Sequence, residues 1–228
     1  MKKAWPLFAK LLLVAPVLVF PGCAMMEEAK KGSASKVEQK RLAALRDQAA
    51  VEHSLYRSVA NWKKNTYKNK ALVEAATPDR VALEISLNEQ RGLLLVDGAI
   101  AMDFPVATGK KSHPTPAGRY AILARHKQYA SNLYGKIYDA EGTVVVADAD
   151  TRTDPIPEGG RFEGASMPYW MRLTTTGVGL HVGYVPGRPA SHGCIRLRTD
   201  TAKTLFSLTK IGTPVVIDGP MPSLASRL

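Results

Sequence analysis

Cysteine, aromatic side chains and long apolar runs are scarce in this chain of 228 residues. Two cysteines allow at most one disulfide. Aromatic residues make up 7% of the chain, and it contains no nucleic-acid motif or aromatic stacking platform, so we expect no nucleic-acid partner despite a net charge of +11. The apolar run Leu11–Phe20 is shorter than the roughly 20 residues that span a bilayer, which argues against a retained transmembrane helix.

The remaining composition is that of a globular protein, with 45% hydrophobic and 22% charged residues. The length suits one domain with a sizeable core plus an appendage. The positive charge favours acidic partners such as anionic lipid or a carboxylate-rich polymer. Many of these charges lie in the N-terminal segment, where a solvated helix face also explains them.

The N-terminus has the pattern of an export signal. A basic start, Met1–Lys3, precedes the apolar run, and Pro21-Gly22-Cys23 follows it. We therefore predict a signal peptide over residues 1–23 in which Cys23 looks like the lipidated cysteine of a bacterial lipobox. Cleavage without lipidation is the main alternative. Ala24 after the cysteine favours anchoring at the outer membrane, on the periplasmic side.

Residues 24–77 are predicted to be a linker followed by an amphipathic helical segment. Residues 27–35 are small and polar, and Ser35 with Glu38 forms a capping-box pattern. Apolar residues then recur at helical spacing up to Thr77-Pro78. They are Leu42, Leu45, Ala49, Leu55, Val59 and Trp62. This stripe is expected to pack on the following domain or on another chain.

Residues 78–218 are predicted to form a mainly β, β-sandwich-like domain, with residues 219–228 as a C-terminal tail. Short β-like runs alternate with turns, and Asp97-Gly98 is a hairpin signal. Residues 200–208 are expected to form a helix with Asp200 as its cap. Residues 125–168 are rich in Gly, Asp, Pro and Tyr and are expected to be an irregular lid or binding loop beside the substrate cleft.

The stretch Ser191–Arg196, with the sequence Ser-His-Gly-Cys-Ile-Arg, has the features of a nucleophile loop. Cys194 is a candidate nucleophile because a thiol beside an imidazole base can be activated near neutral pH. Gly193 permits a tight turn and lets a substrate carbonyl approach backbone amides that would form an oxyanion hole. The spacing alone does not decide whether His181 or His192 is the base.

These residues resemble the signature of the L,D-transpeptidase (YkuD-type) catalytic domain. The resemblance extends over roughly residues 80–218, through His181-Val182-Gly183, the turn at Thr115–Gly118 and the segment Ser166–Met171. It implies that His181 is the proton donor and acceptor and that the fold is β-sandwich-like. It also implies that Cys194 cleaves a peptidoglycan tetrapeptide stem through a thioester, with no cofactor, and that carbapenems acylate it.

Supporting roles follow for four neighbours of the pair. Ser191 is expected to hydrogen-bond within the loop, and His192 to shape the loop or position substrate. Arg196 is expected either to bind a substrate carboxylate or to hold the loop. A backbone carbonyl near Val182 or Gly183 is expected to orient His181.

Three alternatives to a transpeptidase remain open at this stage. Water as the acyl acceptor would make the same site an L,D-carboxypeptidase or hydrolase. A degenerate site would leave a non-catalytic wall-binding lipoprotein. His181, His192 and Cys194 are also three potential zinc ligands, but no fourth ligand has evident spacing, so no metal is expected. The oligomeric state is not indicated by the sequence.

Overall fold

The computed structural model describes residues 22–218. Most of the predicted signal peptide and the predicted tail, residues 219–228, therefore lie outside the described residues, and Cys23 is described only as backbone of a helix. The chain divides into two compact units, residues 1–43 and 44–228. Within the described range, no helix combines the length and the apolar character needed to cross a membrane.

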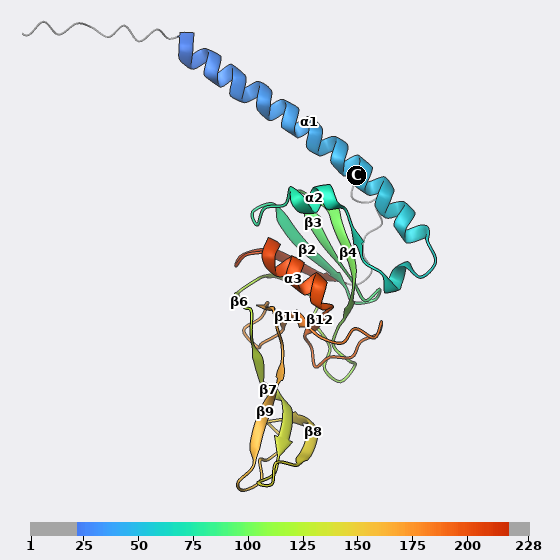
Figure 1. Ribbon diagram of the computed structural model, residues 1–228, viewed down its shortest axis with the longest axis vertical. Helices are drawn as coiled ribbons and strands as arrows, with labels where there is room; N and C mark the ends of the chain where they lie inside the picture. The colour runs from blue at the N-terminus through green and yellow to red at the C-terminus, as the bar shows by residue number, and fades with distance from the viewer. Residues whose placement is uncertain (1–21, 219–228) are drawn as a thin grey trace, which may run out of the picture. The chain divides into compact units, whose positions relative to one another are not determined.

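The described residues are mainly β, with a helix at the N-terminal end, as predicted (Figure 1). The helical elements are α1 (Gly22–Ser58), the 3-10 turn η1 (Trp62–Lys64), α2 (Lys70–Glu74) and α3 (Thr199–Leu208). The strands are β1 (Tyr67–Lys68), β2 (Val81–Ser86), β3 (Arg91–Val96), β4 (Ala99–Ala107), β5 (Gly118–Ala121), β6 (Ala124–His126), β7 (Ala130–Tyr138), β8 (Val144–Asp150), β9 (Arg161–Ser166), β10 (Trp170–Arg172), β11 (Gly179–Val182), β12 (Ile195–Leu197) and β13 (Pro214–Asp218).

Ten strands form one sheet in the order β5-β13-β2-β3-β4-β12-β11-β10-β6, with β1 paired to β4. The nine residues of β4 are all buried, and its end pairs with β12 through Val106 and Ala107. The turn between β3 and β4 is Asp97-Gly98, whose φ angles of 47° and 81° are those that a two-residue hairpin favours. Strand β12 follows Cys194 and lies parallel to β11, which carries His181, so the sheet holds both elements side by side.

Four predictions about local structure are wrong. Residues 27–35 are not a linker, and Ser35 does not begin a helix, because α1 begins at Gly22 and runs through them. Helix α3 begins at Thr199, and Asp200 lies in its first turn, where a carboxylate is favourable beside the positive end of the helix dipole. The segment 125–168 is regular: β8, β7 and β9 form a separate three-stranded antiparallel sheet.

The buried face of α1 is partly polar. Ala49 and His53 are buried and Leu45 is half-buried, whereas Leu55 and Val59 of the predicted apolar stripe are exposed. His53 Nε2 lies 2.7 Å from Oδ2 of Asp103, a fully buried carboxylate on β4. The residues from 44 to 58 are therefore bound to the ten-stranded sheet by polar contacts as well as by apolar packing.

Asp103 is the centre of this polar cluster. Arg57 Nε donates to its Oδ2 at 2.9 Å, and Arg91 Nε donates to its Oδ1 at 2.8 Å. Burial acts to raise the pKa of Asp103, but the contacts from His53, Arg91 and Arg57 outweigh burial and hold the pKa below its ordinary value. A buried carboxylate is tolerated here because three partners satisfy it.

Candidate active site

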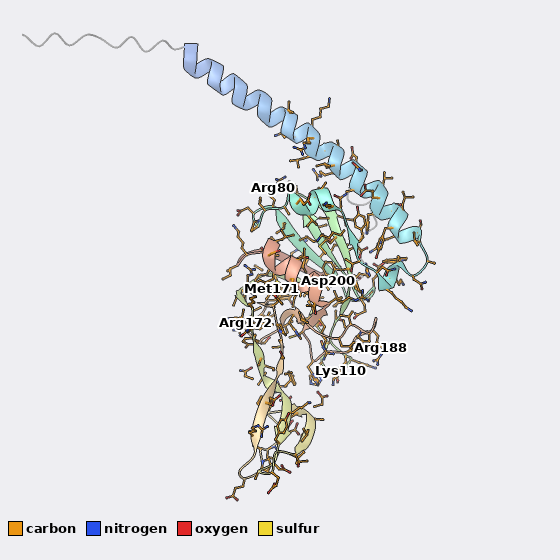
Figure 2. The ribbon with its side chains drawn as sticks, viewed as in Figure 1. Arg80, Lys110, Met171, Arg172, Arg188 and Asp200 are labelled. Carbon is orange, nitrogen blue, oxygen red and sulfur yellow. The ribbon has the colours of Figure 1, made fainter. Side chains whose placement is uncertain are left out.

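Cys194 and His181 line the same cavity, which has a volume of about 350 Å³. Its walls come from β10, β11, the nucleophile loop and the three-stranded sheet. Figure 2 shows Arg172 and Lys110 at the end of the large sheet that faces this smaller sheet. The lining residues are Tyr129, Ser131, Asn132, Leu133, Tyr134, Arg152, Ala165, Met167, Trp170, Arg172, Thr175, Thr176, Gly177, Val178, His181, Ser191, His192, Cys194 and Arg196. The segment 125–168 therefore borders the cavity, as expected, although its structure is regular.

Cys194 is a free thiol that is partly exposed to this cavity. Its Sγ lies 3.6 Å from the carbonyl oxygen of Gly177. Burial raises the pKa of the thiol, while the backbone amide of Gly179 and the charge of Arg196 act in the opposite direction. The thiol is therefore protonated at rest, and its activation requires a base.

His181 has the tautomer and the charge state that such a base needs. Its side chain is 7% exposed, and its Nδ1 lies 2.7 Å from the carbonyl oxygen of Val182. Because a carbonyl only accepts, this contact places the proton on Nδ1 and leaves Nε2 as an acceptor. Burial lowers the pKa of His181 to about 4, with Arg196 contributing in the same direction, so the imidazole is neutral near pH 7.

The nucleophile loop is held by a dense set of hydrogen bonds. The Ser191 hydroxyl donates to the carbonyl oxygen of Cys194, and the carbonyl of Thr108 accepts from the amides of Ala190 and Ser191 at 2.8 and 3.0 Å. Thr115, which is 4% exposed, donates from Oγ1 to the carbonyl oxygen of Gly193 at 2.8 Å. The loop is thus fixed before any substrate binds.

The amide of Gly193, which was expected to be an oxyanion donor, has a partner within the loop. This N–H already donates to Ser191 Oγ at 3.1 Å, so in this structure it is not directed at a developing oxyanion. The amide of Cys194, in contrast, has no hydrogen-bond partner among the described residues. It is the better candidate for an oxyanion donor from this loop.

Arg196 lies on β12 and lines the cavity, and no carboxylate in the described part of the chain forms an ion pair with it. The methylene groups of its side chain pack against Gly183, where an added Cβ would lie 2.9 Å from Arg196 Cγ. Arg152 and Arg172 also line the cavity, but each is occupied, Arg152 by Asp150 and Arg172 by the carbonyls of Thr174 and Thr175. Arg196 is therefore the cation available to a ligand.

His192 lies at the junction between the nucleophile loop and the three-stranded sheet. Its ring stacks on Tyr134 at 4.5 Å between centroids, and its Nε2 lies 2.9 Å from Nζ of Lys110. Asp148 on β8 is 3.5 Å from the same Nε2. His192 thus connects the two sheets and does not share the buried environment of His181.

Sequence reasoning did not single out Tyr134 and Arg152 as cavity residues, whereas Trp170 lies in the segment Ser166–Met171 that carried part of the family resemblance. Trp170 stacks face to face with Tyr129 at 4.0 Å, and this pair forms part of the cavity wall. Only the expectation that residues 125–168 border the cleft indicated that side chains from this region would be found there. Among the described residues, no group of three or more His, Cys, Asp or Glu side chains is arranged to hold a metal ion.

The chain is similar to known proteins. A family model, the YkuD L,D-transpeptidase catalytic domain, matches residues 80–217. The probable L,D-transpeptidase 3 of Mycobacterium tuberculosis is 27% identical over 120 residues, which cover 50% of this chain and 37% of that protein. L,D-transpeptidase 1 of the same organism is 29% identical over 133 residues, which cover 54% of this chain and 44% of that protein. The chain thus spans less than half the length of these curated relatives.

Solved structures of L,D-transpeptidases are also similar to this chain. That of an L,D-transpeptidase from Mycobacterium smegmatis has 22% sequence identity and a TM-score of 0.47, covering 61% of this chain and 59% of that one. An L,D-transpeptidase in complex with imipenem has 21% identity and a TM-score of 0.46, with the same two coverages.

Proposed function

The chain belongs to the YkuD L,D-transpeptidase catalytic domain family, and from this membership we propose that it is a cysteine-dependent L,D-transpeptidase of peptidoglycan stem peptides. The observation that carries the proposal is the placement of Cys194 and His181 in one cavity, with Nδ1 of His181 bound to the carbonyl of Val182. This arrangement supplies a nucleophile and an oriented, neutral base.

In the first step, Sγ of Cys194 attacks the carbonyl carbon of the third residue of a tetrapeptide stem. The thiol proton passes to Nε2 of His181 as the C–S bond forms. The negative charge on the former carbonyl oxygen is stabilised by the amide of Cys194, which has no other partner among the described residues.

The tetrahedral intermediate then collapses. The C–N bond to the terminal D-alanine breaks, and the proton on Nε2 of His181 moves to the leaving amine, so that a thioester on Cys194 and a neutral imidazole remain. An acceptor amine attacks the thioester and transfers its proton to His181, which returns it to the departing sulfur. The product is a new amide, and the enzyme regains its resting state.

The acceptor decides the outcome. An amine on a neighbouring stem gives a 3→3 crosslink, a lysine of an anchored protein gives attachment to the wall, and water gives a tripeptide. Arg196 is suited to hold a stem carboxylate beside the reacting bond, because it lines the cavity and is not paired with a carboxylate among the described residues. No metal or organic cofactor takes part in these steps.

We further propose that the protein is exported, lipidated at Cys23 and held on the periplasmic side of a membrane, with the outer membrane favoured. The support is the signal-like sequence of residues 1–23 and the residue Ala24. Mass spectrometry of the protein purified from membranes tests this: an acylated Cys23 at the mature N-terminus is expected. An unmodified chain that begins at Met1 would contradict it.

The function is tested by incubating the full chain in detergent with purified disaccharide-tetrapeptide and identifying the products by mass spectrometry. A crosslinked dimer that lacks one D-alanine is expected, and the Cys194→Ala variant should form none. A tripeptide alone would identify a carboxypeptidase. Absence of both products, with Cys194 shown to be reduced, would favour a non-catalytic wall-binding protein.

A further inference from the structure

A second cavity of about 390 Å³ lies beside segments that flank the catalytic strands. It is lined by Lys63, Lys64, Glu89, Gln90, Pro105, Tyr184, Val185, Pro186, Gly187 and Arg198. None of these residues lines the cavity that holds Cys194. The two cavities therefore have separate walls, and the second one takes no part in the mechanism described above.

The second cavity is cationic. Lys63, Lys64 and Arg198 are exposed, and none of them forms an ion pair with a carboxylate of the described residues. The single carboxylate of the lining, Glu89, accepts from Arg57 at 3.1 Å and is thereby neutralised. Three cations around one neutralised carboxylate create a positive potential that favours an anionic ligand.

An exposed aromatic residue adds a second kind of contact. Tyr184 is 78% exposed and lies two residues after the end of β11, at the start of the segment 184–187 that forms one wall of the cavity. An exposed tyrosine offers an apolar ring and a polar hydroxyl to the same ligand. The cavity thus suits a ligand that carries carboxylates on a partly apolar peptide backbone.

The floor of this cavity is bonded to the nucleophile loop. Gln90 donates from Nε2 to Thr108 Oγ1 at 2.7 Å and accepts from the amide of Thr108 at 2.9 Å. The carbonyl of Thr108 in turn accepts from the amide of Ser191 at 3.0 Å. Gln90, which lines the second cavity, is therefore connected through Thr108 to Ser191 in the loop that carries Cys194.

We propose that the second cavity binds a carboxylate-bearing stem peptide of peptidoglycan, separately from the stem that reacts at Cys194. The choice of stem peptide as the ligand rests on the proposed function, because that polymer presents such carboxylates at high local density. When one stem of the polymer is bound in the second cavity, the neighbouring stems are held at a high local concentration beside the catalytic cavity. The enzyme therefore binds the polymer more tightly without any new contact in the catalytic cavity.

The test is a photo-crosslinking experiment on the full chain in detergent, carrying Cys194→Ala so that no turnover occurs. A tetrapeptide stem with a diazirine group is irradiated with this protein, and the labelled residues are mapped by mass spectrometry. We expect saturable labelling at residues 63–64 and 184–187. The labelling there should fall about tenfold when Lys63→Gln and Lys64→Gln remove the charge-assisted contacts.

Two matched controls accompany the test. The pair Lys136→Gln and Lys203→Gln removes the same charge from exposed positions that line neither cavity, and it should leave the labelling unchanged. A stem whose carboxylates are converted to amides should fail to compete. Labelling confined to the catalytic cavity, or equal competition by the amidated stem, would overturn the proposal.

Two further outcomes separate this proposal from the proposed function. The second cavity could be labelled even though the wild-type protein makes no product from tetrapeptide. That result would support the second binding site and refute the proposed transpeptidase activity. A glycerol-phosphate oligomer that displaces the label, when excess unlabelled stem does not, would overturn the assignment of a stem peptide.

Discussion

The hydroxyl of Thr115 joins two segments that are 78 residues apart, because it donates to the carbonyl oxygen of Gly193 at 2.8 Å. The hydroxyl oxygen of Thr115 also accepts from the amide of Gly109 at 2.8 Å. Thr115 therefore fixes the peptide that immediately precedes Cys194. A buried hydroxyl with two partners costs folding free energy if either is lost.

Replacing Thr115 by valine should slow the acylation of Cys194 and destabilise the fold by about 1–3 kcal/mol, because two buried polar groups lose their partner. Carbapenem acylation followed by intact mass, together with urea unfolding, measures both effects. Thr115→Ser keeps the hydroxyl and should recover most of the acylation rate. An unchanged rate in the valine variant would show that this hydrogen bond does not position the nucleophile.

Short-range patterns predicted the hairpin at Asp97-Gly98, because a two-residue turn needs positive φ at both positions and few residue types accept it. The sequence could not predict that His53 packs against Asp103, since a helical stripe is recognised from apolar residues and these are polar. The regular sheet in residues 125–168 was missed for a related reason. Its strands are mostly half-exposed and rich in polar and small residues, so the alternation that identifies a strand is weak.

In the site, too, residues within one short motif could be predicted, whereas contacts between distant segments could not. The motif singled out Cys194 and His181, which line one cavity, but the partner of the Gly193 amide, Ser191 Oγ, depends on how the loop closes. Tyr134 reaches His192 only because the small sheet lies against the nucleophile loop. Such contacts between distant segments leave no local sequence pattern.

Asp103→Asn should destabilise the protein strongly, by about 3–5 kcal/mol, because Arg57 and Arg91 would lose their buried counter-charge and His53 its carboxylate partner. Urea unfolding measures the change. Asp79→Asn removes a carboxylate that pairs with Lys210 at the surface and should cost no more than about 1 kcal/mol. Equal effects of the two variants would show that the buried cluster does not contribute as described.

The same cluster predicts a pH dependence of stability. The pKa of Asp103 in the folded protein is held below its ordinary value, so the unfolded chain binds a proton more readily than the folded one. Stability from this group is therefore complete above the unfolded pKa of 3.8 and is lost as the pH falls towards the folded pKa. Wild type should lose more stability than Asp103→Asn between pH 5 and the acid transition.

Gly193→Ala should reduce both stability and acylation. Gly193 has φ 113°, and the nearest atoms to an added Cβ are 3.9 Å away, so backbone strain and not crowding is the cause. Gly142→Ala is a suitable control because its φ is 82°, nothing lies within 4 Å of its Cβ position, and it lies in the remote turn between β7 and β8. Both should lose about 1–3 kcal/mol, but only Gly193→Ala should slow acylation. A normal rate in that variant would show that the loop tolerates strain without moving the thiol.

The low pKa of His181 predicts an unusual acid limit for activity. A base must be neutral to accept the thiol proton, and burial lowers the pKa of His181 to about 4. The rate of carbapenem acylation should therefore stay high as the pH falls through 6.5, the ordinary histidine value, and should decline only near pH 4. A midpoint near 6.5, in protein shown by circular dichroism to be folded, would contradict this assignment. His181→Ala should slow acylation by about 10²–10⁴ across the whole range.

Arg196 should determine the preference for a free carboxylate on the stem. It is a cation of the catalytic cavity that is not paired with a carboxylate among the described residues. A charge-assisted hydrogen bond to the substrate contributes about 1.5–3 kcal/mol of binding free energy, which corresponds to roughly a tenfold to hundredfold change in kcat/KM. Arg196→Gln should lower kcat/KM for a tetrapeptide with free carboxylates by that factor, but should change it little for the amidated stem. The ratio of the two substrates separates this role from a structural one, since a distorted loop would slow both equally. Arg196→Lys keeps the charge without the planar fork and should recover only part of the preference.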